Sequence, residues 1–305
     1  MRPSGPSITV IIPAFNSARF LGKTLSTIAK QDYKADEVII VDGGSTDGTR
    51  DVVGEFANLL PIRFISEPDR GQLDAVQKGM RMAKGDVLCW INADDAVMPG
   101  AFARAARAFA EDPSVEIVFG DNYWFDETGR RFGVAHSVKR LTFWDQFLFY
   151  GQLQVESFFW RRELSEKALP FDTDLRVYTD YSFFLPIRHG AKCKWIPYRL
   201  GAFRVHPEQM STVNHAKGDA ERELVKQRMR ERLGMDEAEF RRLRRRHLPR
   251  FVIAQRILPK VSSALRYACR RLTGDVVRKR LSRYFFDEWL RPATEVPSRS
   301  SKPGR

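Results

Sequence analysis

The sequence predicts an α/β protein built on a doubly wound, mostly parallel sheet, with a mixed extension of the sheet and a C-terminal helical basic tail. Three observations lead to this prediction. Residues 1–121 alternate short β-branched runs with helical patterns, which is typical of βαβ units. Residues 122–205 contain aromatic-rich segments separated by turn signals, which favours a mixed sheet with helices. Residues 216–305 carry 25 basic and 11 acidic side chains, so the net charge of +13 lies in the tail.

The parallel half is predicted from five short apolar runs. They are Ile8 to Ile12, Val38 to Val41, Ile62 to Ile65, Val87 to Ile91 and Ile117 to Phe119. Helical patterns lie between them at about residues 18–30, 46–57, 73–83 and 99–110. The second helix has a capping signal in Ser45, Thr46 and Asp47, and Pro99 suits the first turn of the fourth. Because such apolar strands need helices on both faces, residues 1–121 are predicted to form a nucleotide-binding sheet.

The overall composition excludes several classes of protein. With 305 residues, 43% of them hydrophobic, the chain can bury a large core and is not a disordered tail protein. Cys89, Cys193 and Cys269 are too scattered for a disulfide framework or a zinc knuckle, which favours a reducing compartment. No apolar run reaches the roughly 18–20 residues of a membrane span, and the first residues lack a secretory signal. We therefore expect a soluble, cytoplasmic chain.

Polar and acidic side chains follow the ends of three predicted strands. These ends are Pro13-Ala14-Phe15-Asn16, Asp42-Gly43-Gly44-Ser45 and Asn92-Ala93-Asp94-Asp95, and Asp74 lies at the start of the third helix. In open α/β sheets, ligands bind beyond the carboxyl ends of the strands. No Walker motif and no GxGxxG follows the first strand, so a glycine loop is not expected to hold phosphate. Because carboxylates repel phosphate unless a cation lies between them, Asp94 and Asp95 predict a divalent cation beside a diphosphate.

Six motifs occur in order from about Ser7 to Thr212, roughly two thirds of the chain. They are ITVIIPAFN, VIIVDGGSTDGT, EPDRGQLDA, GDVLCWINADD, FDTDLRVYTDYSFFLPI and FRVHPEQMST. With these motifs the chain resembles glycosyltransferase family 2, whose members have the GT-A fold and transfer sugars from nucleoside-diphosphate donors. The resemblance implies a GT-A domain over residues 1–215, with a nucleotide-binding half (1–121) and an acceptor and catalytic half (122–215).

The resemblance assigns the donor site to the first half of the chain. The residues implied for the nucleotide are Pro13, Ala14 and Phe15 around the base and ribose, Asp42 on the base, and Gln72 and Asp74 in the next segment. Asn92, Ala93 and Asp94 occupy the DxD motif, whose last acid coordinates the Mn²⁺ or Mg²⁺ that bridges the donor diphosphate. Asn92 departs from this motif, because an amide can bond to ribose or sugar but supplies no negative charge. Asp95 is expected beside the donor sugar or the acceptor.

The resemblance implies the catalytic group in the second half. Asp180, in VYTDYSFF, matches the family's catalytic acid, which removes the acceptor's hydroxyl proton as that oxygen attacks the anomeric carbon opposite the leaving diphosphate. His206 resembles the late histidine that completes the metal or diphosphate site, and Arg204 is expected beside a phosphate. A metal there takes the charge that develops on the leaving group. The implied reaction is an inverting, metal-dependent transfer.

Structural roles compete with some of these assignments. Asp42 lies in DGGSTDGT, where turn and capping needs alone favour Asp, Gly and Ser. Asp180 is also a candidate cap of the helix that follows it, and Asp174 is a second candidate base. A histidine before a proline, such as His206, is usually a turn or surface residue. Glu156, in LQVESFFW, is given a structural role ahead of a place in the acceptor site.

The basic tail is predicted as a helical extension over residues 216–292 and a disordered end over residues 293–305. Its run RRLRRRHLPR is interpreted first as a solvated helix face, then as a surface for anionic lipid, and last as a nucleic-acid site. The lipid interpretation gains weight because basic helices that carry Phe285, Phe286 and Trp289 suit the inner leaflet of a membrane. It would place the enzyme peripherally on the cytoplasmic face.

These observations predict transfer from a UDP-sugar, ahead of GDP- and dTDP-sugars, to a glycan or lipid-linked acceptor of a surface polysaccharide or glycolipid. Asn92 keeps one alternative open, a degenerate protein that binds a sugar nucleotide without turnover. A nucleotidyltransferase is disfavoured because IIPAFNSARF lacks a glycine-rich, basic loop. A nucleic-acid-binding protein would have to use residues 216–305 and would show steep salt dependence.

Overall fold

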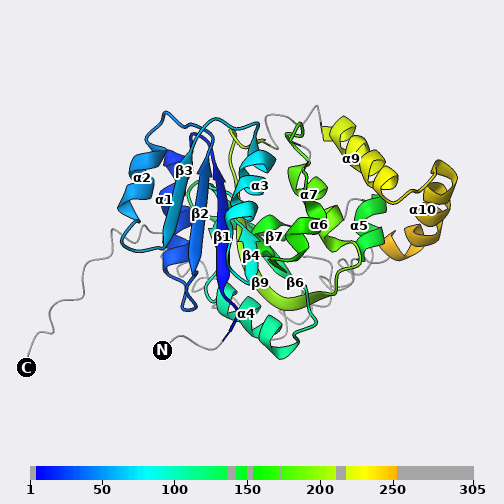
Figure 1. Ribbon diagram of the computed structural model, residues 1–305, viewed down its shortest axis with the longest axis horizontal. Helices are drawn as coiled ribbons and strands as arrows, with labels where there is room; N and C mark the ends of the chain where they lie inside the picture. The colour runs from blue at the N-terminus through cyan, green and yellow to red at the C-terminus, as the bar shows by residue number, and fades with distance from the viewer. Residues whose placement is uncertain (1–4, 136–141, 150–153, 172, 211–217, 253–305) are drawn as a thin grey trace, which may run out of the picture.

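A computed structural model describes residues 5–135, 142–149, 154–171, 173–210 and 218–252 of the chain. Its centre is a nine-stranded sheet with the strand order β3-β2-β1-β4-β8-β6-β9-β5, in which β7 pairs with β6. Figure 1 shows helices on both sides of this sheet. The predicted α/β class is therefore confirmed.

The sheet has a parallel part and a mixed part. The parallel part is β1 (Ile8–Ala14), β2 (Glu37–Asp42), β3 (Ile62–Ser66) and β4 (Val87–Trp90). The mixed part is β5 (Ala96–Val97), β6 (Ile117–Asp126), β7 (Arg131–Ala135), β8 (Phe158–Arg161) and β9 (Cys193–Val205). Strand β8 runs antiparallel between β4 and β6, whereas β9 runs parallel to β6. This is the mixed extension that the aromatic-rich segments predicted.

Helices form a layer on each face of the sheet, and each layer closes its own apolar core. One layer contains α1 (Ala18–Ala29), α2 (Thr49–Glu55) and α4 (Ala101–Glu111). The other contains α3 (Gln72–Met82), α5 (Phe143–Phe149), α6 (Leu164–Ala168) and α7 (Thr179–Arg188). Because side chains alternate along a strand, Val10 and Ile12 of β1 enter the first core and Ile11 enters the second. Burial on both faces explains why β1 is apolar at every position except Thr9.

Two helices begin later than predicted, each directly after a glycine with positive φ. Helix α2 begins at Thr49 and not near residue 46, because Gly48 directly before it adopts a left-handed conformation with φ of 89°. The capping signal acts beside it, since Oδ1 of Asp47 accepts a hydrogen bond from the backbone N of Thr49 at 3.1 Å. Helix α4 begins at Ala101 after Gly100, whose φ is 70°, so Pro99 precedes the helix and does not occupy its first turn.

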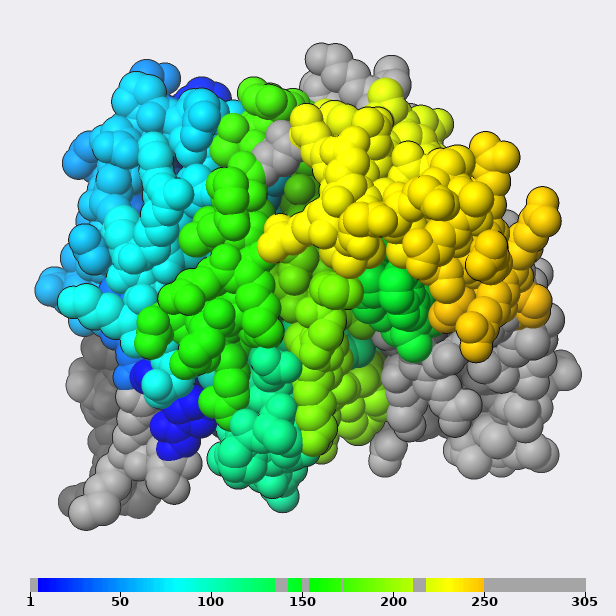
Figure 2. All heavy atoms as spheres, turned by 45° about the vertical axis from the view of Figure 1, so that its right-hand side comes forward, coloured from blue at the N-terminus to red at the C-terminus, as the bar shows by residue number. Residues whose placement is uncertain are grey.

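The basic segment contributes two helices, α9 (Gly218–Arg232) and α10 (Glu237–Val252). They pack on the second core through a few apolar residues, and Figure 2 shows them as a surface layer at one side of the molecule. Residues 253–305, which include the predicted disordered end and the three tail aromatics, lie outside the described residues. Within the described part of the chain, every helix is too short or too polar to cross a membrane.

Candidate active site

The carboxyl ends of β1, β2 and β4 meet at one edge of the sheet, which brings the predicted donor residues together. Ala14 at the end of β1 is paired with Asp42 at the end of β2, and the backbone N of Gly43 donates to the carbonyl of Ala14 at 2.9 Å. Pro13 and Ala14 are thus fixed by the sheet. Phe15 follows them with 64% of its surface exposed. An exposed aromatic ring at a strand end is a suitable flat surface for a ligand, because its burial would be favourable.

Asp42 has the turn role that the sequence offered as a structural alternative. Its carboxylate is buried and accepts hydrogen bonds from the backbone N of Ser45 at 3.0 Å and from Oγ of Ser66 at 2.7 Å. These bonds hold the β2–α2 turn and the end of β3 together. The contact between Asp42 and a nucleobase stays a prediction. A second carboxylate, Asp69, lies close to this turn, and its pKa is raised by burial and by the neighbouring acids.

Gln72 and Asp74, at the start of α3, do different things. The carboxylate of Asp74 accepts bonds from the backbone N of Arg70 at 3.2 Å and from its guanidinium at 3.3 Å. Burial opposes ionisation, but these bonds and the charge of Lys78 lower the pKa of Asp74. Gln72 instead points to the strand ends. Its Nε2 donates to Asn92 at 3.0 Å, and its Oε1 accepts a bond from Oγ1 of Thr179 at 2.7 Å.

Asn92, the first residue of the DxD motif, is held by four hydrogen bonds to protein groups. Its Oδ1 accepts bonds from Trp90 Nε1 at 2.9 Å and from Gln72. Its Nδ2 donates to Asp95 Oδ2 at 2.9 Å and to Glu156 Oε1 at 3.1 Å. Because a side-chain amide has two donor and two acceptor positions, the capacity of Asn92 is fully used. A bond from Asn92 to ribose or sugar stays a prediction, and it would require one of these four to be exchanged.

Asp95 and Glu156 form a pair of buried carboxylates beneath the strand end. Each side chain is 1% exposed. Burial raises the pKa of both groups, and the charge of Glu156 raises the pKa of Asp95 further. Oδ1 of Asp95 also accepts the backbone N–H of Arg204 at 2.7 Å, which ties β9 to the motif. The expected contact of Asp95 with the sugar or the acceptor stays a prediction, since Asp95 supports the strand end from the interior.

Asp94 is the acid of the motif that reaches solvent. Its side chain is 32% exposed, and its Oδ2 lies 2.9 Å from Nε2 of His206. Ala93 beside it is fixed by Thr24, whose Oγ1 donates to the Ala93 carbonyl at 2.8 Å. The ring of His206 packs against Phe20 with the centroids 4.8 Å apart. The fold therefore brings into contact Asp94 and His206, the two residues that the sequence predicted for the metal site.

The donor set of Asp94 and His206 fits a divalent cation shared with a substrate. A carboxylate oxygen and an imidazole nitrogen that face one another are a hard and a borderline ligand, as Mn²⁺ accepts. Among the described residues, no group of three or more His, Cys, Asp or Glu side chains is arranged to hold a metal. Cations in phosphate-transfer sites are commonly bound by one or two protein groups and by substrate phosphates. Asp94 and His206 match this pattern.

Arg204 lies inside the protein and not beside the open face of Asp94. Its side chain is 1% exposed, and its guanidinium lies over the rings of Phe20 (4.8 Å) and Phe125 (4.4 Å). Its Nε donates to the carbonyl of Asp94 at 2.6 Å. Burial lowers the pKa of Arg204, although the nearby acids oppose this. The geometry is that of a residue that positions Asp94 and Asp95, and the expected phosphate contact stays a prediction.

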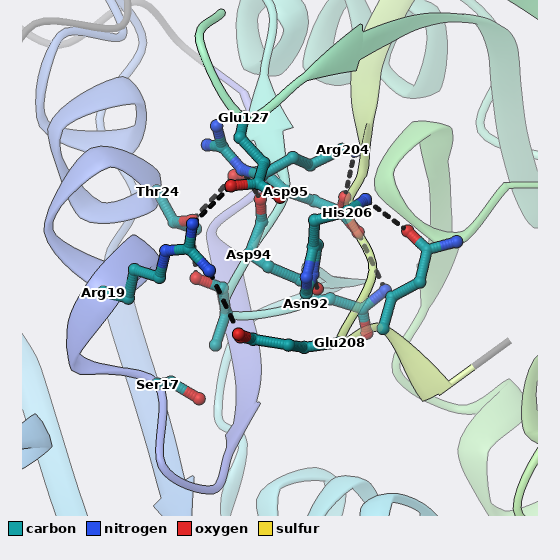
Figure 3. Close-up of polar contacts among 12 residues, drawn as sticks. Ser17, Arg19, Thr24, Asn92, Asp94, Asp95, Glu127, Arg204, His206 and Glu208 are labelled. Atoms are coloured by element: carbon teal, nitrogen blue, oxygen red, sulfur yellow. Dashed lines mark hydrogen bonds and ion pairs between the residues drawn. The ribbon is translucent and has the colours of Figure 1, made fainter. Parts of the chain in front are cut away.

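An ion-pair cluster joins three segments beside this site, as Figure 3 shows. Arg19 of α1 pairs with Glu127, in the turn between β6 and β7, and with Glu208, after β9, at 3.3 Å. The Arg19 guanidinium also lies 4.8 Å from the ring of Phe20. These groups are partly exposed, so the cluster contributes little to stability, and it links α1 to the turn after β6 and to the segment that follows His206.

Asp180 lies in the first turn of α7 and is half-buried. Its Oδ1 accepts a hydrogen bond from the backbone N of Tyr181 at 2.7 Å. Burial raises the pKa of Asp180 to about 7, and the charge of Glu156 adds to the shift. A carboxylate with a pKa near neutral pH is suited to accept a proton in a reaction. Thr179 beside it bonds to Gln72, which connects α7 to the DxD segment.

Two residues of the site were not identified from the sequence. Glu156 was given a structural role, and Asn122, which donates to Glu156 Oε2 at 2.7 Å, was not considered. The available signal was a charged residue inside the apolar run LQVESFFW. A carboxylate in such a run needs buried partners, and these come from the segment after β4 and from β6, distant in sequence.

Comparisons with known proteins are consistent with this geometry. Residues 9–167 match the model of "Glycosyl transferase family 2". A protein of Mycobacterium bovis (strain BCG / Pasteur 1173P2), described as a PGL/p-HBAD biosynthesis glycosyltransferase, is 33% identical over 183 residues, which cover 59% of this chain and 69% of that protein.

Two solved structures show the same fold. S. aureus TarS 1-349 in complex with UDP-GlcNAc aligns with a TM-score of 0.58 and 20% identity, and covers 68% of this chain and 61% of TarS 1-349. The mannosyltransferase PcManGT from Pyrobaculum calidifontis, in complex with GDP-Man and Mn²⁺, aligns with a TM-score of 0.58 and 22% identity. It covers 94% of this chain and 85% of the solved one.

Proposed function

The chain belongs to glycosyltransferase family 2, and on this premise we propose that it moves a sugar from a nucleoside-diphosphate sugar to a hydroxyl group of a glycan or a lipid-linked acceptor. The anomeric carbon is inverted in this transfer. The observation that carries the proposal is the contact between Asp94 and His206, 2.9 Å apart at the partly exposed end of β4. Asp94 and His206 would hold a divalent cation, Mn²⁺ or Mg²⁺, that stabilises the charge on the leaving diphosphate.

Asp180 is the proposed base. A carboxylate with a pKa of about 7 is largely ionised just above neutral pH and can still bind a proton firmly when the acceptor hydroxyl loses it. The hydroxyl oxygen forms the new bond to the anomeric carbon, the bond from that carbon to the diphosphate oxygen breaks, and the nucleoside diphosphate leaves with the electron pair. One carboxylate is enough for this step, because no covalent intermediate forms.

The nucleoside is proposed to lie between the β1 and β2 ends. Phe15 offers an exposed ring there, and Pro13, Ala14 and Asp42 form the rest of the edge. Gln72, Asp74 and Asn92 extend the site toward the cation. A UDP-sugar is the proposed donor, ahead of GDP- and dTDP-sugars; TarS was solved with UDP-GlcNAc and PcManGT with GDP-Man, so both bases occur in neighbours of this fold.

The acceptor is proposed to be a precursor of a surface polysaccharide or glycolipid, reached at a membrane. Arginines on α10 that point to solvent support this proposal, because a basic helix is attracted to anionic headgroups. The enzyme would then work peripherally on the cytoplasmic face. The relative from Mycobacterium bovis is named as a glycosyltransferase of PGL/p-HBAD biosynthesis.

The saturated amide of Asn92 favours one alternative, a protein that binds a sugar nucleotide without transferring it. In that case a nucleoside diphosphate would bind, but none would be released from a nucleotide sugar. This difference defines the experiment.

The test is a thermal-unfolding screen of the full chain with UDP, GDP, dTDP and CDP, each with Mn²⁺, with Mg²⁺ and with chelator. Ligand at 100 times its Kd stabilises by about 2.7 kcal/mol, which corresponds to several degrees. We expect one nucleoside diphosphate to stabilise only with metal. Release of that diphosphate from its sugar conjugates is then measured to separate an enzyme from a binding protein.

The matched variants are Asp94→Asn and Asp51→Asn, the second on the exposed surface of α2. Asp94→Asn is expected to abolish the metal-dependent stabilisation, whereas Asp51→Asn leaves it intact. If no diphosphate stabilises the wild type with any metal, or if Asp94→Asn keeps the full shift, the proposed function is wrong.

A further inference from the structure

A buried carboxylate stands next to the motif position that lacks one. The first position of the DxD motif is Asn92, which carries no charge. Its Nδ2 donates to Oε1 of Glu156 at 3.1 Å, although Glu156 comes from η1 (Val155–Ser157), far away in the sequence. An amide and a carboxylate are thus in direct contact where the motif itself would place a carboxylate.

The orientation of the Asn92 amide follows from its partners. The indole N–H of Trp90 can only donate, so the atom that faces it at 2.9 Å is the oxygen. The nitrogen therefore faces Asp95 and Glu156, whose oxygens accept its two hydrogens. The amide connects the donor on β4 to the two buried acids.

Glu156 is held by two amides and by a hydrogen bond with the carboxyl group of Asp95. Oε2 accepts Nδ2 of Asn122 at 2.7 Å, Oε1 accepts Asn92, and among the described residues Glu156 takes part in no salt bridge. Only 1% of its surface is exposed. An ionisable group buried without a cation is costly, which argues for a role that an apolar residue could not fill.

The position of Glu156 depends on a close contact with strand β9. Strand β9 passes directly over it at Gly201, where a Cβ atom would lie 2.5 Å from both Cβ and the carbonyl oxygen of Glu156. Three residues later on the same strand, Arg204 donates its backbone N to Asp95 and its Nε to the carbonyl of Asp94. The Asn92–Glu156 contact and the Asp94 position are therefore joined by Asp95 and Arg204.

We propose that Asn92 and Glu156 are a transposed acid–amide pair, in which Glu156 supplies the carboxylate missing from the first DxD position and supports Asp94 as a metal ligand. The metal-ligand part rests on the proposed function; the pairing does not. Glu156 is then a positioning residue, because it acts on Asp94 through Asn92, Asp95 and Arg204.

The proposal requires the two residues to be exchangeable only together. In Asn92→Asp, the two amide hydrogens that Asp95 and Glu156 accept are lost, and a third carboxyl group faces these two acids. In Glu156→Gln, the Asn92 amide loses its only carboxyl partner besides Asp95 among the described residues. In the double variant, the carboxylate at position 92 keeps the donors Trp90 and Gln72 and gains the amide at position 156, whose oxygen still accepts Asn122. Asp95 loses one donor, so we expect recovery to be incomplete.

The experiment is a cycle of four proteins: wild type, Asn92→Asp, Glu156→Gln and the double variant. Mn²⁺ is titrated with UDP at a fixed concentration, with GDP as a second probe, and the Mn²⁺ concentration for half-maximal stabilisation is measured. Thermal unfolding without metal is measured in parallel. Losses of outer-shell partners weaken metal affinity about 10- to 100-fold. We expect each single variant to show such a loss and the double variant to return to within about threefold of wild type.

The control is Asp145→Asn, a buried carboxylate on α5 that bonds to Thr142 and lies outside the site. It is expected to lower the unfolding temperature and leave the Mn²⁺ midpoint unchanged. If the losses of the two single variants simply multiply in the double variant, or if they affect unfolding but not the Mn²⁺ midpoint, the proposal is overturned.

Two further outcomes are decisive. If both single variants fail to fold and the double variant folds, the pairing is supported; if the double variant also fails to fold, it is overturned. If the wild type binds neither diphosphate with Mn²⁺, the proposed function fails, and the unfolding cycle alone decides the pairing. Recovery of the unfolding temperature in the double variant then supports it, and additive losses overturn it.

Discussion

Nε2 of His206 lies 2.9 Å from Oδ2 of Asp94, although 112 residues separate the two in the sequence. The contact depends on β9, which ends at Val205, and on β5, which pairs with it immediately after the DxD motif. The antiparallel β5–β9 pair therefore joins the last motif of the sequence to the strand end in the middle of the sheet.

Replacing His206 by Phe is expected to weaken metal-dependent binding and to preserve the packing. The ring against Phe20 is retained, but the nitrogen that faces Asp94 is lost. We expect the Mn²⁺ concentration for half-maximal UDP stabilisation to rise by about 10-fold or more, the size of loss that is typical when a residue of a metal site is removed. The unfolding temperature without metal should change little. An unchanged Mn²⁺ midpoint would show that His206 has no part in a metal site.

Asp180→Asn is expected to abolish transfer, and the pH profile of the wild-type activity is expected to follow the ionisation of Asp180. Because the base must be ionised, kcat/KM of the wild type should rise with pH through about 7. The Asn variant should release no nucleoside diphosphate above background at any pH. The range of roughly pH 6 to 8 brackets this pKa, and a wild-type profile that is flat over that range would contradict the role of Asp180 as base.

The same variant is expected to be more stable than the wild type at alkaline pH. The pKa of Asp180 is raised in the folded state, so the folded protein binds this proton more tightly than the unfolded chain. Stability from this group is present at low pH and is lost as the pH rises from its unfolded pKa through about 7. We expect the unfolding temperature of Asp180→Asn to exceed that of wild type by a few degrees at pH 8 and to approach it only as the pH falls to about 4, near the unfolded pKa of Asp. A constant difference would reject this cause.

Gly201→Ala is expected to destabilise the protein because β9 crosses the η1 backbone there. The added Cβ would lie 2.5 Å from atoms of Glu156, and overpacking of this kind costs about 1–3 kcal/mol. The control is Gly54→Ala in α2, where nothing lies within 4 Å of the added atom. It should be neutral or stabilise by up to about 1 kcal/mol, because alanine is a better helix former. Urea unfolding measures both, and equal effects would contradict the close approach.

Arg204→Lys separates a positioning role from phosphate binding. Lysine cannot stack between Phe20 and Phe125 and lacks the Nε that bonds to the Asp94 carbonyl. We expect a loss of about 1–3 kcal/mol in the free energy of unfolding without ligand. If unfolding is unchanged and only UDP binding weakens, Arg204 contacts a phosphate and the positioning role is wrong.

The lipid proposal is tested with vesicles and the full chain. Three exposed arginines of α10 are changed to Gln, and the matched control changes three exposed arginines of the body. The α10 set is Arg242, Arg245 and Arg246, and the body set is Arg63, Arg81 and Arg107. Each basic residue near an anionic surface contributes about 1 kcal/mol, so the loss of three should weaken binding of the α10 variant to anionic vesicles on the order of 100-fold.

The control set should bind these vesicles like the wild type, and none of the three proteins should bind neutral vesicles. Equal losses in both sets would mean that overall charge, and not α10, determines attachment. Failure of the wild type to bind anionic vesicles at low salt would reject the membrane surface, and retention on DNA would favour the nucleic-acid alternative.

Much of the fold could be predicted from the sequence because its signals are local. The apolar runs of β1 and β2 predict strands that are buried on both faces, because such strands do not alternate apolar and polar residues. The predicted starts of α2 and α4 were wrong, because a sequence pattern does not show which glycine adopts a positive φ, as Gly48 and Gly100 do. Strand β5, with two residues, is too short to leave a pattern.

The candidate site could be predicted only in part. Asp94, Asp180 and His206 were found because each lies in a short motif with its own recognisable neighbours. Glu156 and the buried position of Arg204 were not found, because their roles depend on partners from other strands. A single charged letter in an apolar run indicates that something must pair with it, but not what.

The sequence by itself determined the α/β class, the family and the acidic strand ends, because periodicity and motif order are properties of neighbouring residues. Only the tertiary structure decided which groups meet: that His206 reaches Asp94, that Asn92 has no free hydrogen-bonding capacity, and that the carboxylate beside it belongs to Glu156. The physical reason is that desolvation and hydrogen-bond satisfaction act on atoms a few ångströms apart in space, and strand pairing sets those distances.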